Sequence, residues 1–335
     1  MKKILLAVGL LAAMVFAGAL WMLSSAYRGF SSPSVLVQIP RGASSARIGE
    51  ILAGKGVIAS PLHFRLARLL DPKARLQAGE YCFAQPATVR DVYARLVRGD
   101  IYRIAVTIPE GSSRFDIARI LAEQGFGTEA EFLHTSARPD LISDLAPNAP
   151  SLEGYLFPAT YLFSRGTAAG QICREMTRRF RQAWKAAGGD GETVHRVTTM
   201  ASLIEKETGV PDERPVVASV YWNRLKQKMK LEADPSVSYA AQLDNRWRGK
   251  IYRSDLNNPH PYNTYQHTGL PPGPIANPGQ KSLEAALKPD TTDYLFFVAR
   301  ADGSGGHNFS KNLKGHQKAV ASYRSAIKNK KSTDE

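Results

Sequence analysis

Cysteine is scarce in this sequence, and its scarcity excludes several classes of protein. Only Cys82 and Cys173 occur among 335 residues, too few for a disulfide scaffold or for a zinc site of four cysteines. Their spacing leaves open whether they pair. The sequence also lacks a glycine-rich motif of the kind that cradles phosphate, and His260 and His267 have no acidic or cysteine companion at metal-ligand spacing. We therefore expect neither a cofactor nor a metal.

Acidic residues are fewer than basic ones. The 30 Asp and Glu against 44 Lys and Arg leave a net charge of 44 − 30 = +14. This balance suits an anionic partner such as a lipid surface, a nucleic acid or an acidic polymer, and it also suits plain solubility. Hydrophobic residues make up 43% and charged residues 22%, which excludes a disordered or collagen-like chain.

Charge is absent from Ile4 to Leu23, a run of 20 residues. A helix of this length spans about 30 Å, the hydrocarbon thickness of a bilayer. Lys2 and Lys3 precede the run, which predicts a cytoplasmic N-terminus and an extracytoplasmic remainder. The small residues Ala17–Ala19 also fit a cleaved signal peptide, but the apolar run continues beyond them and favours an uncleaved anchor. This placement argues against nucleic acid as the partner.

The segment after the anchor predicts a small module of order β-α-α-β-α. Serine and proline mark the helix starts, because a side-chain oxygen caps the first turn and proline fits the first helical position. Thr88 and Asp91 form a variant of the capping box. The expected elements are a strand at Val35–Ile39, helices from Ser44 or Ser45, from Ser60 and from Thr88, and a strand at Gly79–Phe83.

Part of this module recurs at an offset of 69 residues. Ile39–Gly42 (Ile-Pro-Arg-Gly) returns as Ile108–Gly111 (Ile-Pro-Glu-Gly). The apolar positions of the following helix and its terminating glycine recur at the same offset, as the pairs Ile48 and Ile117, Ile51 and Ile120, Leu52 and Leu121, and Gly56 and Gly125. We interpret this as a duplication, and expect the second copy to continue differently after Phe126.

A longer helix over residues 194–208 carries the main candidate acid. Val194, Val197, Ala201 and Ile204 fall on one helical face, and Glu205 lies beside it. Glu205 is therefore expected to point into an apolar cleft, where a carboxyl keeps its proton more readily, as a general acid for glycoside cleavage requires. A solvated acid at a helix end has the same pattern. Glu207 lies roughly 200° further around the helix and cannot share the site.

A loop over residues 257–278 holds six prolines and shows no periodicity. Loops of this length inside a compact domain are usually functional or disordered, and the aromatic and amide side chains here argue against disorder. Aromatic faces and amides are what a groove for a sugar polymer needs. Upstream, Asp234 is expected to cap a helix at Asp234-Pro235, and Asn277-Pro278 is expected to cap another that reaches about Leu287. A buried strand is expected at 294–299.

Seven motifs stand in one order along the chain: Leu152–Pro158, Ala201–Thr208, Asn223–Leu225, Asp234–Pro235, Tyr262–Tyr265, Gly269–Gly273 and Gly305–Phe309. In this order they resemble the MltG/YceG family of endolytic murein transglycosylases over essentially the whole chain. The resemblance implies cleavage of nascent peptidoglycan strands between N-acetylmuramic acid and N-acetylglucosamine. It also implies a 1,6-anhydro end in place of added water, so that glycan elongation is terminated.

The resemblance carries site residues with it. The first glutamate of the family's Glu-Lys-Glu-Thr motif is its catalytic acid, which maps to Glu205. Other motif positions and nearby acids are expected to bind substrate or shape the site, with Glu213 and Asp234 as candidates for stabilising oxocarbenium-like charge and capping as the alternative for Asp234. This wider set is Glu207, Glu213, Asn223, Asp234, Tyr262, Asn263, Thr264 and Tyr265. No second acid has a clear claim on the chemistry.

The implied fold is α+β, with one transmembrane helix, a LysM-like β-α-α-β glycan-binding module and a mixed α/β catalytic domain of the YceG-like type. The expected segments are a stub (1–3), an anchor (4–23), a linker (24–34), the LysM-like module (35–102), a second related half-module and connector (103–150), the catalytic domain (151–327) and a flexible basic tail (328–335).

The expected location is the bacterial inner membrane, with the catalytic domain in the periplasm. The expected partners are peptidoglycan glycan strands, the inner membrane itself and peptidoglycan synthases, without nucleic acid. A non-catalytic peptidoglycan-binding scaffold and a lysozyme-type hydrolase remain as alternatives.

Overall fold

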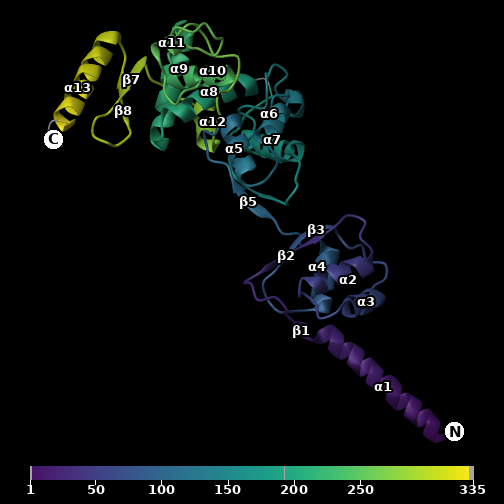
Figure 1. Cartoon of the computed structure of the whole chain (residues 1–335). Helices are drawn as coiled ribbons and strands as arrows, with labels where there is room; N and C mark the ends of the chain where they lie inside the picture. The colour runs from purple at the N-terminus through teal and green to yellow at the C-terminus, as the bar shows by residue number, and fades with distance from the viewer. Residues whose placement is uncertain (1, 192, 332–335) are drawn as a thin grey trace. The chain divides into compact units, whose positions relative to one another are not determined.

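The computed structural model describes residues 2–191 and 193–331 and divides the chain into two compact units (Figure 1). The first unit comprises the chain as far as Ala105 together with Leu162–Arg165. The second comprises Val106–Tyr161 and the chain from Gly166 onward. Each unit has its own hydrophobic core, and they are described separately.

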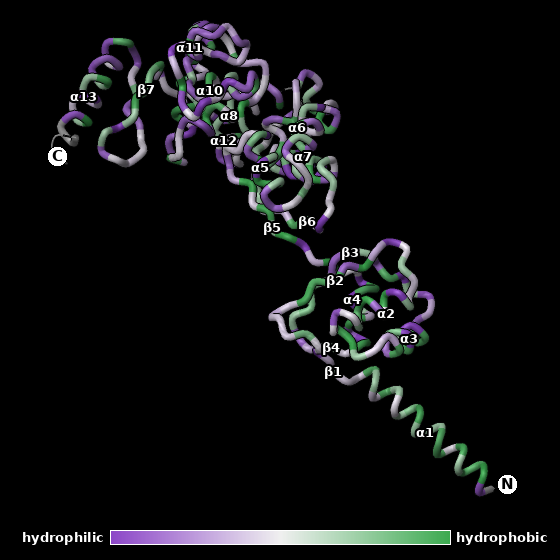
Figure 2. The backbone as a smooth tube through the Cα atoms, in the orientation of Figure 1, coloured by the Kyte–Doolittle hydropathy of each residue, from purple (hydrophilic) through white to green (hydrophobic). Residues whose placement is uncertain are grey.

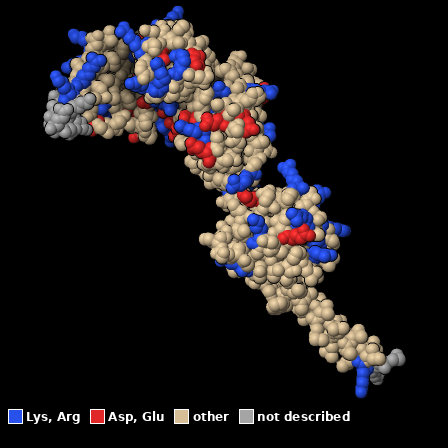
Figure 3. All heavy atoms as spheres, in the orientation of Figure 1, with Lys and Arg blue, Asp and Glu red and all other residues tan. Residues whose placement is uncertain are grey.

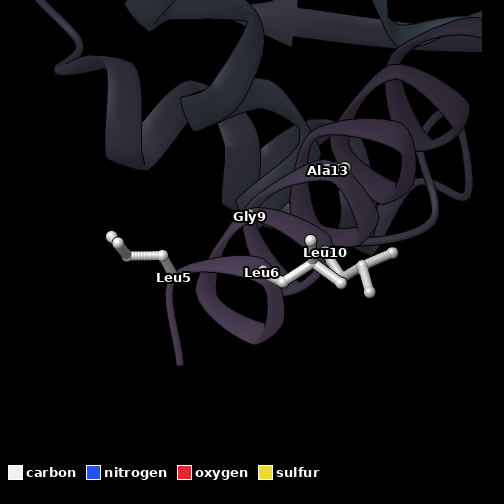
Figure 4. Close-up of a pocket in the computed structure, with 5 residues that line it drawn as sticks. All are labelled: Leu5, Leu6, Gly9, Leu10 and Ala13. Atoms are coloured by element: carbon white, nitrogen blue, oxygen red, sulfur yellow. The ribbon is translucent and has the colours of Figure 1, made fainter. Parts of the chain in front are cut away.

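The first unit begins with the apolar helix α1 (Lys2–Ser24), which is hydrophobic along its length (Figure 2) and carries charge only at its N-terminal end (Figure 3). It is long and apolar enough to cross a membrane, a test that a signal sequence also passes. Side chains such as Leu5, Leu6 and Leu10 project outward around a shallow open recess (Figure 4). At the other end, Leu23 is only 8% exposed because it packs into the core of the module that follows.

That module has the predicted order of strands and helices. Its elements are β1 (Ala26–Tyr27), β2 (Val35–Ile39), α2 (Ser45–Gly54), α3 (Pro61–Leu70), β3 (Gly79–Phe83), β4 (Ala87–Thr88) and α4 (Val89–Arg98). Strands β2 and β3 pair antiparallel, with Val37 opposite Tyr81, and both side chains are fully buried. The expected caps are present, since Ser44, Ser60 and Thr88 each accept a hydrogen bond from the first turn of their helix.

The second small sheet in this unit was not predicted. Strand β1 begins two residues after α1 and pairs antiparallel with β4, which joins the end of α1 directly to the module. Beyond it, the amide of Gly29 donates to the carbonyl of Gly56 at 2.8 Å. Strands of two residues carry too little pattern to be predicted from sequence.

The second unit is mainly helical. Its elements, with the shared strands β5 and β6, are β5 (Ile104–Thr107), α5 (Arg114–Glu123), α6 (Glu129–Ser136), η1 (Pro139–Leu141), β6 (Thr160–Phe163), α7 (Ala169–Ala186), α8 (Val194–Glu207), η2 (Pro211–Glu213), α9 (Arg214–Lys226), α10 (Asp234–Leu243), α11 (Arg253–Leu256), α12 (Gln280–Leu287), β7 (Phe296–Ala299), β8 (His307–Ser310) and α13 (Leu313–Lys331). Strands β5 and β6 pair, as do β7 and β8. Together the units form a mixed α/β fold, as expected.

The duplication is confirmed and extends further than predicted. Gly42 and Gly111 occupy the same turn with φ of 76° and 73°, and Ser44 and Ser113 cap the helices that follow. The expectation that the copies diverge after Phe126 is wrong, because α6 follows α5 as α3 follows α2, and β6 then returns to pair with β5. The longer connection before β6, which includes η1, hides this correspondence in the sequence.

Helix α8 lies at the centre of the second unit. The four residues of its predicted apolar face are buried, and so are all residues from Val197 to Ile204. Helices α9, α10 and α12 pack against it. Close packing along most of its length holds the helix firmly, and its last turn carries Glu205.

Three local predictions are corrected by the structure. Ala233, not Asp234, is the N-cap of α10, and Asp234 is its first helical residue. Helix α12 begins at Gln280 after Gly279, so Asn277-Pro278 does not cap it. The strand expected at 294–299 is shorter, Phe296–Ala299, and only half-buried. The basic C-terminal segment is helical as far as Lys331, and the last four residues of the expected tail lie outside the described residues.

Candidate active site

Glu205 sits in the last turn of α8 with its side chain only 5% exposed. Its Oε1 accepts a hydrogen bond from Nη2 of Arg214 at 3.0 Å. Its Oε2 accepts one from the backbone N–H of Gly279 at 2.9 Å. Glu205 is buried as expected, but its surroundings are polar and not the expected apolar cleft. A buried carboxyl takes charge-assisted donors where the chain provides them.

Arg214 reaches Glu205 because the chain reverses between them. Helix α8 ends at Glu207, the single turn η2 follows, and α9 begins at Arg214. The Arg214 side chain is 9% exposed, and its Nε has no hydrogen-bond partner among the described residues. A buried guanidinium with donors left over is suited to bind a further acceptor at this site.

Glu110 is a second carboxylate at this place, and the sequence interpretation missed it. It lies in the turn between β5 and α5, and its Oε2 is 3.8 Å from Nη2 of Arg214. Its side chain is half exposed, so it faces the solvent side of the site. Burial raises the pKa of Glu110, the negative charge of Glu205 raises it further, and Arg214 opposes both effects.

Gly279 separates the two carboxylates from the N-terminus of α12. A Cβ added to Gly279 would lie 2.0 Å from Oε1 of Glu110 and 2.1 Å from its Cδ. The same residue donates its N–H to Glu205. Only glycine leaves room here for a carboxyl against the backbone, which explains its presence between Pro278 and Gln280.

The turn that carries Glu110 is tied to the rest of the unit. The amide of Gly111 donates to the carbonyl of Asn277 at 2.9 Å, and Nζ of Lys206 donates to the carbonyl of Gly111 at 3.2 Å. The Asn277 side chain is fully buried and donates to the carboxyl of Glu153 at 2.9 Å. These contacts hold the turn that carries Glu110 in place beside α8.

Glu153 is a buried carboxyl beside this network. It is 1% exposed, and both its oxygens accept from the backbone N–H of Arg114. Burial raises the pKa of Glu153 to about 7, although the hydrogen bond from Arg114 acts in the opposite direction. By accepting from the first residue of α5, Glu153 supports the turn that carries Glu110.

Glu207 lies apart from Glu205, as the helical spacing predicted. Its Oε2 accepts from the hydroxyl of Tyr221 at 2.9 Å. Burial is the largest effect raising the pKa of Glu207, and Asp234 adds to it. Glu207 is therefore held on a different side of α8 from the pair formed with Arg214.

Glu213 and Asn223 make structural contacts to the start of β8 and to the segment before β7. Glu213 accepts from both the backbone N–H and the Nδ1 of His307, at 2.9 and 2.8 Å. Asn223 donates to the carbonyls of Thr292 and Tyr294. Neither contact involves Glu205, so the structure does not bring these predicted residues to the acid.

The loop over 257–278 is held by its own side chains. Asn263 is fully buried and donates to the carbonyl of Asn258 in the loop and to two carbonyls of α11, and Thr264 accepts from the amide of Ala233. Tyr262 packs against the ring of Tyr239 at 5.2 Å. These three residues shape the loop and leave few atoms for a ligand.

Tyr265 and Asp234 form the exposed polar pair of this region. The Tyr265 hydroxyl donates to Oδ1 of Asp234 at 2.6 Å. The Asp234 carboxylate therefore binds the Tyr265 hydroxyl and does not take the expected capping role. A phenol and a carboxylate at the surface offer the kinds of contact that a sugar uses.

The comparison with known sequences decides the family. The profile described as the YceG-like family matches residues 37–322. The chain belongs to the YceG-like family. A curated relative from Bacillus subtilis, named endolytic murein transglycosylase, is 36% identical over 90% of this chain and 88% of its own length. One from Streptococcus pneumoniae with the same name is 27% identical over 88% of this chain, which spans 59% of that longer protein.

A solved structure extends this family relationship to the fold. The crystal structure of a YceG-like protein from Listeria monocytogenes is 35% identical, with a TM-score of 0.55. The match covers 86% of this chain and 99% of the Listeria chain. The YceG-like assignment made from the seven motifs is thus confirmed.

Proposed function

We propose that this chain is a lytic murein transglycosylase that cleaves the bond between N-acetylmuramic acid and N-acetylglucosamine in nascent peptidoglycan. The observation that carries the proposal is Glu205, a buried carboxyl at the end of the central helix with directed donors on both oxygens. The relatives named endolytic murein transglycosylase support the substrate and the reaction class. The product would carry a 1,6-anhydro-muramic end and would terminate the glycan strand.

The reaction needs one group that first gives and then takes a proton. Protonated Glu205 donates to the glycosidic oxygen as the bond to the anomeric carbon breaks. Ionised Glu205 then takes the proton from the muramic 6-hydroxyl, whose oxygen bonds to the same anomeric carbon. No proton is gained or lost over the two steps. Arg214 and the Gly279 N–H stabilise the ionised carboxylate between them.

The wider set of candidates is assigned to substrate binding around this acid. Asp234 and Tyr265 present polar groups at the surface of the second unit. The remaining candidates support the elements around the acid through the contacts described above; they are Glu207, Glu213, Asn223, Tyr262, Asn263 and Thr264. The β-α-α-β module is proposed to bind glycan in the manner of a LysM module.

The proposed location is the inner membrane, with α1 as a single-pass anchor and the chain beyond α1 in the periplasm. The length and composition of α1 support this placement, and Lys2 and Lys3 favour a cytoplasmic N-terminus. Nascent glycan strands are made at this surface, so peptidoglycan synthases are the proposed protein partners.

A hydrolase acting on the same bond is the second candidate, and Glu110 is the observation that favours it. Hydrolysing glycosidases generally use two carboxylates, one as acid and one as base or nucleophile. Glu110 and Glu205 both face Arg214. The two candidates differ in product, because a hydrolase leaves reducing ends.

The experiment compares the full chain with Glu205→Gln and with the surface control Glu123→Gln on purified peptidoglycan, in detergent. Glu123 is exposed in the last turn of α5. We expect anhydro-muramic ends from the parent and the control and none from Glu205→Gln. Reducing ends would favour the hydrolase. Glycan binding without cleavage by any of the three would favour the scaffold.

A further inference from the structure

The proposed reaction raises an electrostatic question at Glu205. The carboxyl must hold a proton when substrate arrives, yet both of its oxygens face donors in the structure. Arg214 contributes a full positive charge at 3.0 Å, and Gly279 contributes a backbone N–H at 2.9 Å. Such donors favour the ionised form. Another group must therefore offset the positive charge of Arg214.

Glu110 is placed to do this. It faces the same Nη2 atom of Arg214 that binds Glu205, at 3.8 Å. Two carboxylates around one guanidinium carry a net charge of −1 when both are ionised, so the trio binds one proton more readily than Glu205 and Arg214 alone.

The other charged groups near this turn do not replace Glu110. Nζ of Lys206 is engaged with the carbonyl of Gly111, and Glu153 with the backbone of Arg114 and with Asn277. The first turn of α12 contributes Lys281, which pairs with Glu284 at 3.0 Å. Among the described residues, Glu110 is the acid that shares Arg214 with Glu205.

The duplication shows that this acid is a feature of the second copy. The equivalent of Glu110 at the offset of 69 residues is Arg41, in a turn of the same sequence pattern and the same glycine conformation. The turn therefore accepts residues of opposite charge without losing its shape. Glu110 is not required for folding of the turn, and its half-exposed side chain is free to act on the site.

We propose that Glu110 is a positioning residue of this site, which offsets Arg214 so that Glu205 holds the proton that starts the reaction. This inference rests on the proposed function. In the first step the proton passes from Glu205 to the glycosidic oxygen, and Arg214 then stabilises the two ionised carboxylates. In the second step Glu205 takes the proton from the 6-hydroxyl, which restores the starting state. Glu110 forms no bond to the sugar.

The test is the pH profile of cleavage by the full chain carrying Glu110→Gln, with Arg41→Gln as the matched control in the first copy. Without the negative charge of Glu110, Arg214 is offset by Glu205 alone. We expect the ratio of the rate at about pH 8 to that at about pH 5.5 to fall about tenfold, the effect of one nearby charge. Glu110→Asp should recover most of this ratio, and Arg41→Gln should not change it.

Three results would overturn the inference. They are an unchanged ratio in Glu110→Gln, an equal loss of rate at every pH, and loss of all cleavage in a variant that remains folded. The last result would make Glu110 a catalytic base or nucleophile. If the parent itself does not cleave, the proposed function fails.

A carbon-13 NMR titration of the Glu205 carboxyl still tests the inference in that case. The signal is identified by its loss in Glu205→Gln. We expect the carbon-13 shift of the Glu205 carboxyl near neutral pH to differ between Glu110→Gln and the parent. Superimposable titrations would contradict the inference.

Discussion

Arg214 at the start of α9 is joined to Glu205 at the end of α8 by a hydrogen bond of 3.0 Å between two side chains that are 9% and 5% exposed. The candidate acid Glu205 is thus held by the guanidinium of Arg214, which the chain reversal between α8 and α9 brings next to it. This relationship has consequences for both stability and activity.

Removing Arg214 is expected to destabilise the second unit. Arg214→Met leaves the Glu205 carboxyl buried without its charged partner, which costs about 3–5 kcal/mol of unfolding free energy. Arg178→Met is the matched control, because the Arg178–Glu175 pair is 57% and 39% exposed and such surface pairs contribute about 0–1 kcal/mol. Urea unfolding followed by tryptophan fluorescence measures both. Equal losses in the two variants would contradict the account of the buried pair.

The double variant Arg214→Met with Glu205→Gln gives a second check. Removing both charges also removes the unpaired buried carboxylate, so the double variant should be more stable than Arg214→Met alone. Additive losses would show that the two residues do not interact.

Gly279→Ala is expected to impair cleavage more than stability. The added methyl group would lie 2.0 Å from Oε1 of Glu110, and the half-exposed Glu110 side chain can move away into solvent. Its displacement leaves Arg214 facing Glu205 alone, so activity near neutral pH should fall. Gly170→Ala in α7 is the control, because its Cβ would meet only a side-chain atom of Arg174, at 3.9 Å. That change should be neutral or stabilise the helix by about 0.5–1 kcal/mol.

Glu153 is expected to make stability depend on pH. Its pKa is raised by burial from 4.5 to about 7, so the folded state binds more protons than the unfolded state between these values. The free energy of unfolding should therefore be highest below about pH 4.5 with respect to this group and should fall as pH rises toward 7. In Glu153→Gln this part of the dependence should disappear. Urea titrations at several pH values test it, and an identical slope in both proteins would contradict the assignment.

Helix α1 is expected to remain on the mature chain. The apolar run extends to Leu23, and Leu23 packs into the core of the first unit, so cleavage after Ala19 would separate that packed turn from the rest of the helix. Mass spectrometry of protein from alkaline-washed membranes should show an N-terminus before the apolar run. A soluble chain that begins near Leu20 would contradict the anchor.

Features that depend on residues close together in the sequence were predicted correctly. The local pattern predicted the helix caps at Ser44, Ser60 and Thr88. It also predicted the buried face of α8, because each of these features depends on residues nearby in the sequence. The partners of Glu205 were missed because they come from distant segments: Arg214 after a chain reversal, Gly279 from the N-terminus of α12, and Glu110 from the turn before α5. One signal in the sequence could have indicated Glu110. It is the acid of a duplicated turn in which the first copy has Arg41.

The errors in the sequence interpretation have a related cause. Asp234-Pro235 has the pattern of an N-cap, but Tyr265, 31 residues away, takes the carboxylate, and Ala233 becomes the cap. The second copy of the repeat looked truncated because its return strand β6 comes after an insertion. For Asp234 a tertiary contact replaced the local preference that the sequence displays, and for β6 the insertion separated the two paired strands in the sequence.

The measurement that tests the central claim most directly is the analysis of product ends after digestion of purified peptidoglycan in water enriched in oxygen-18. An internal attack by the 6-hydroxyl takes no oxygen from solvent. We predict anhydro-muramic ends without oxygen-18 from the parent chain and none from Glu205→Gln. Reducing ends that carry oxygen-18, or cleavage that survives in Glu205→Gln, would contradict the account.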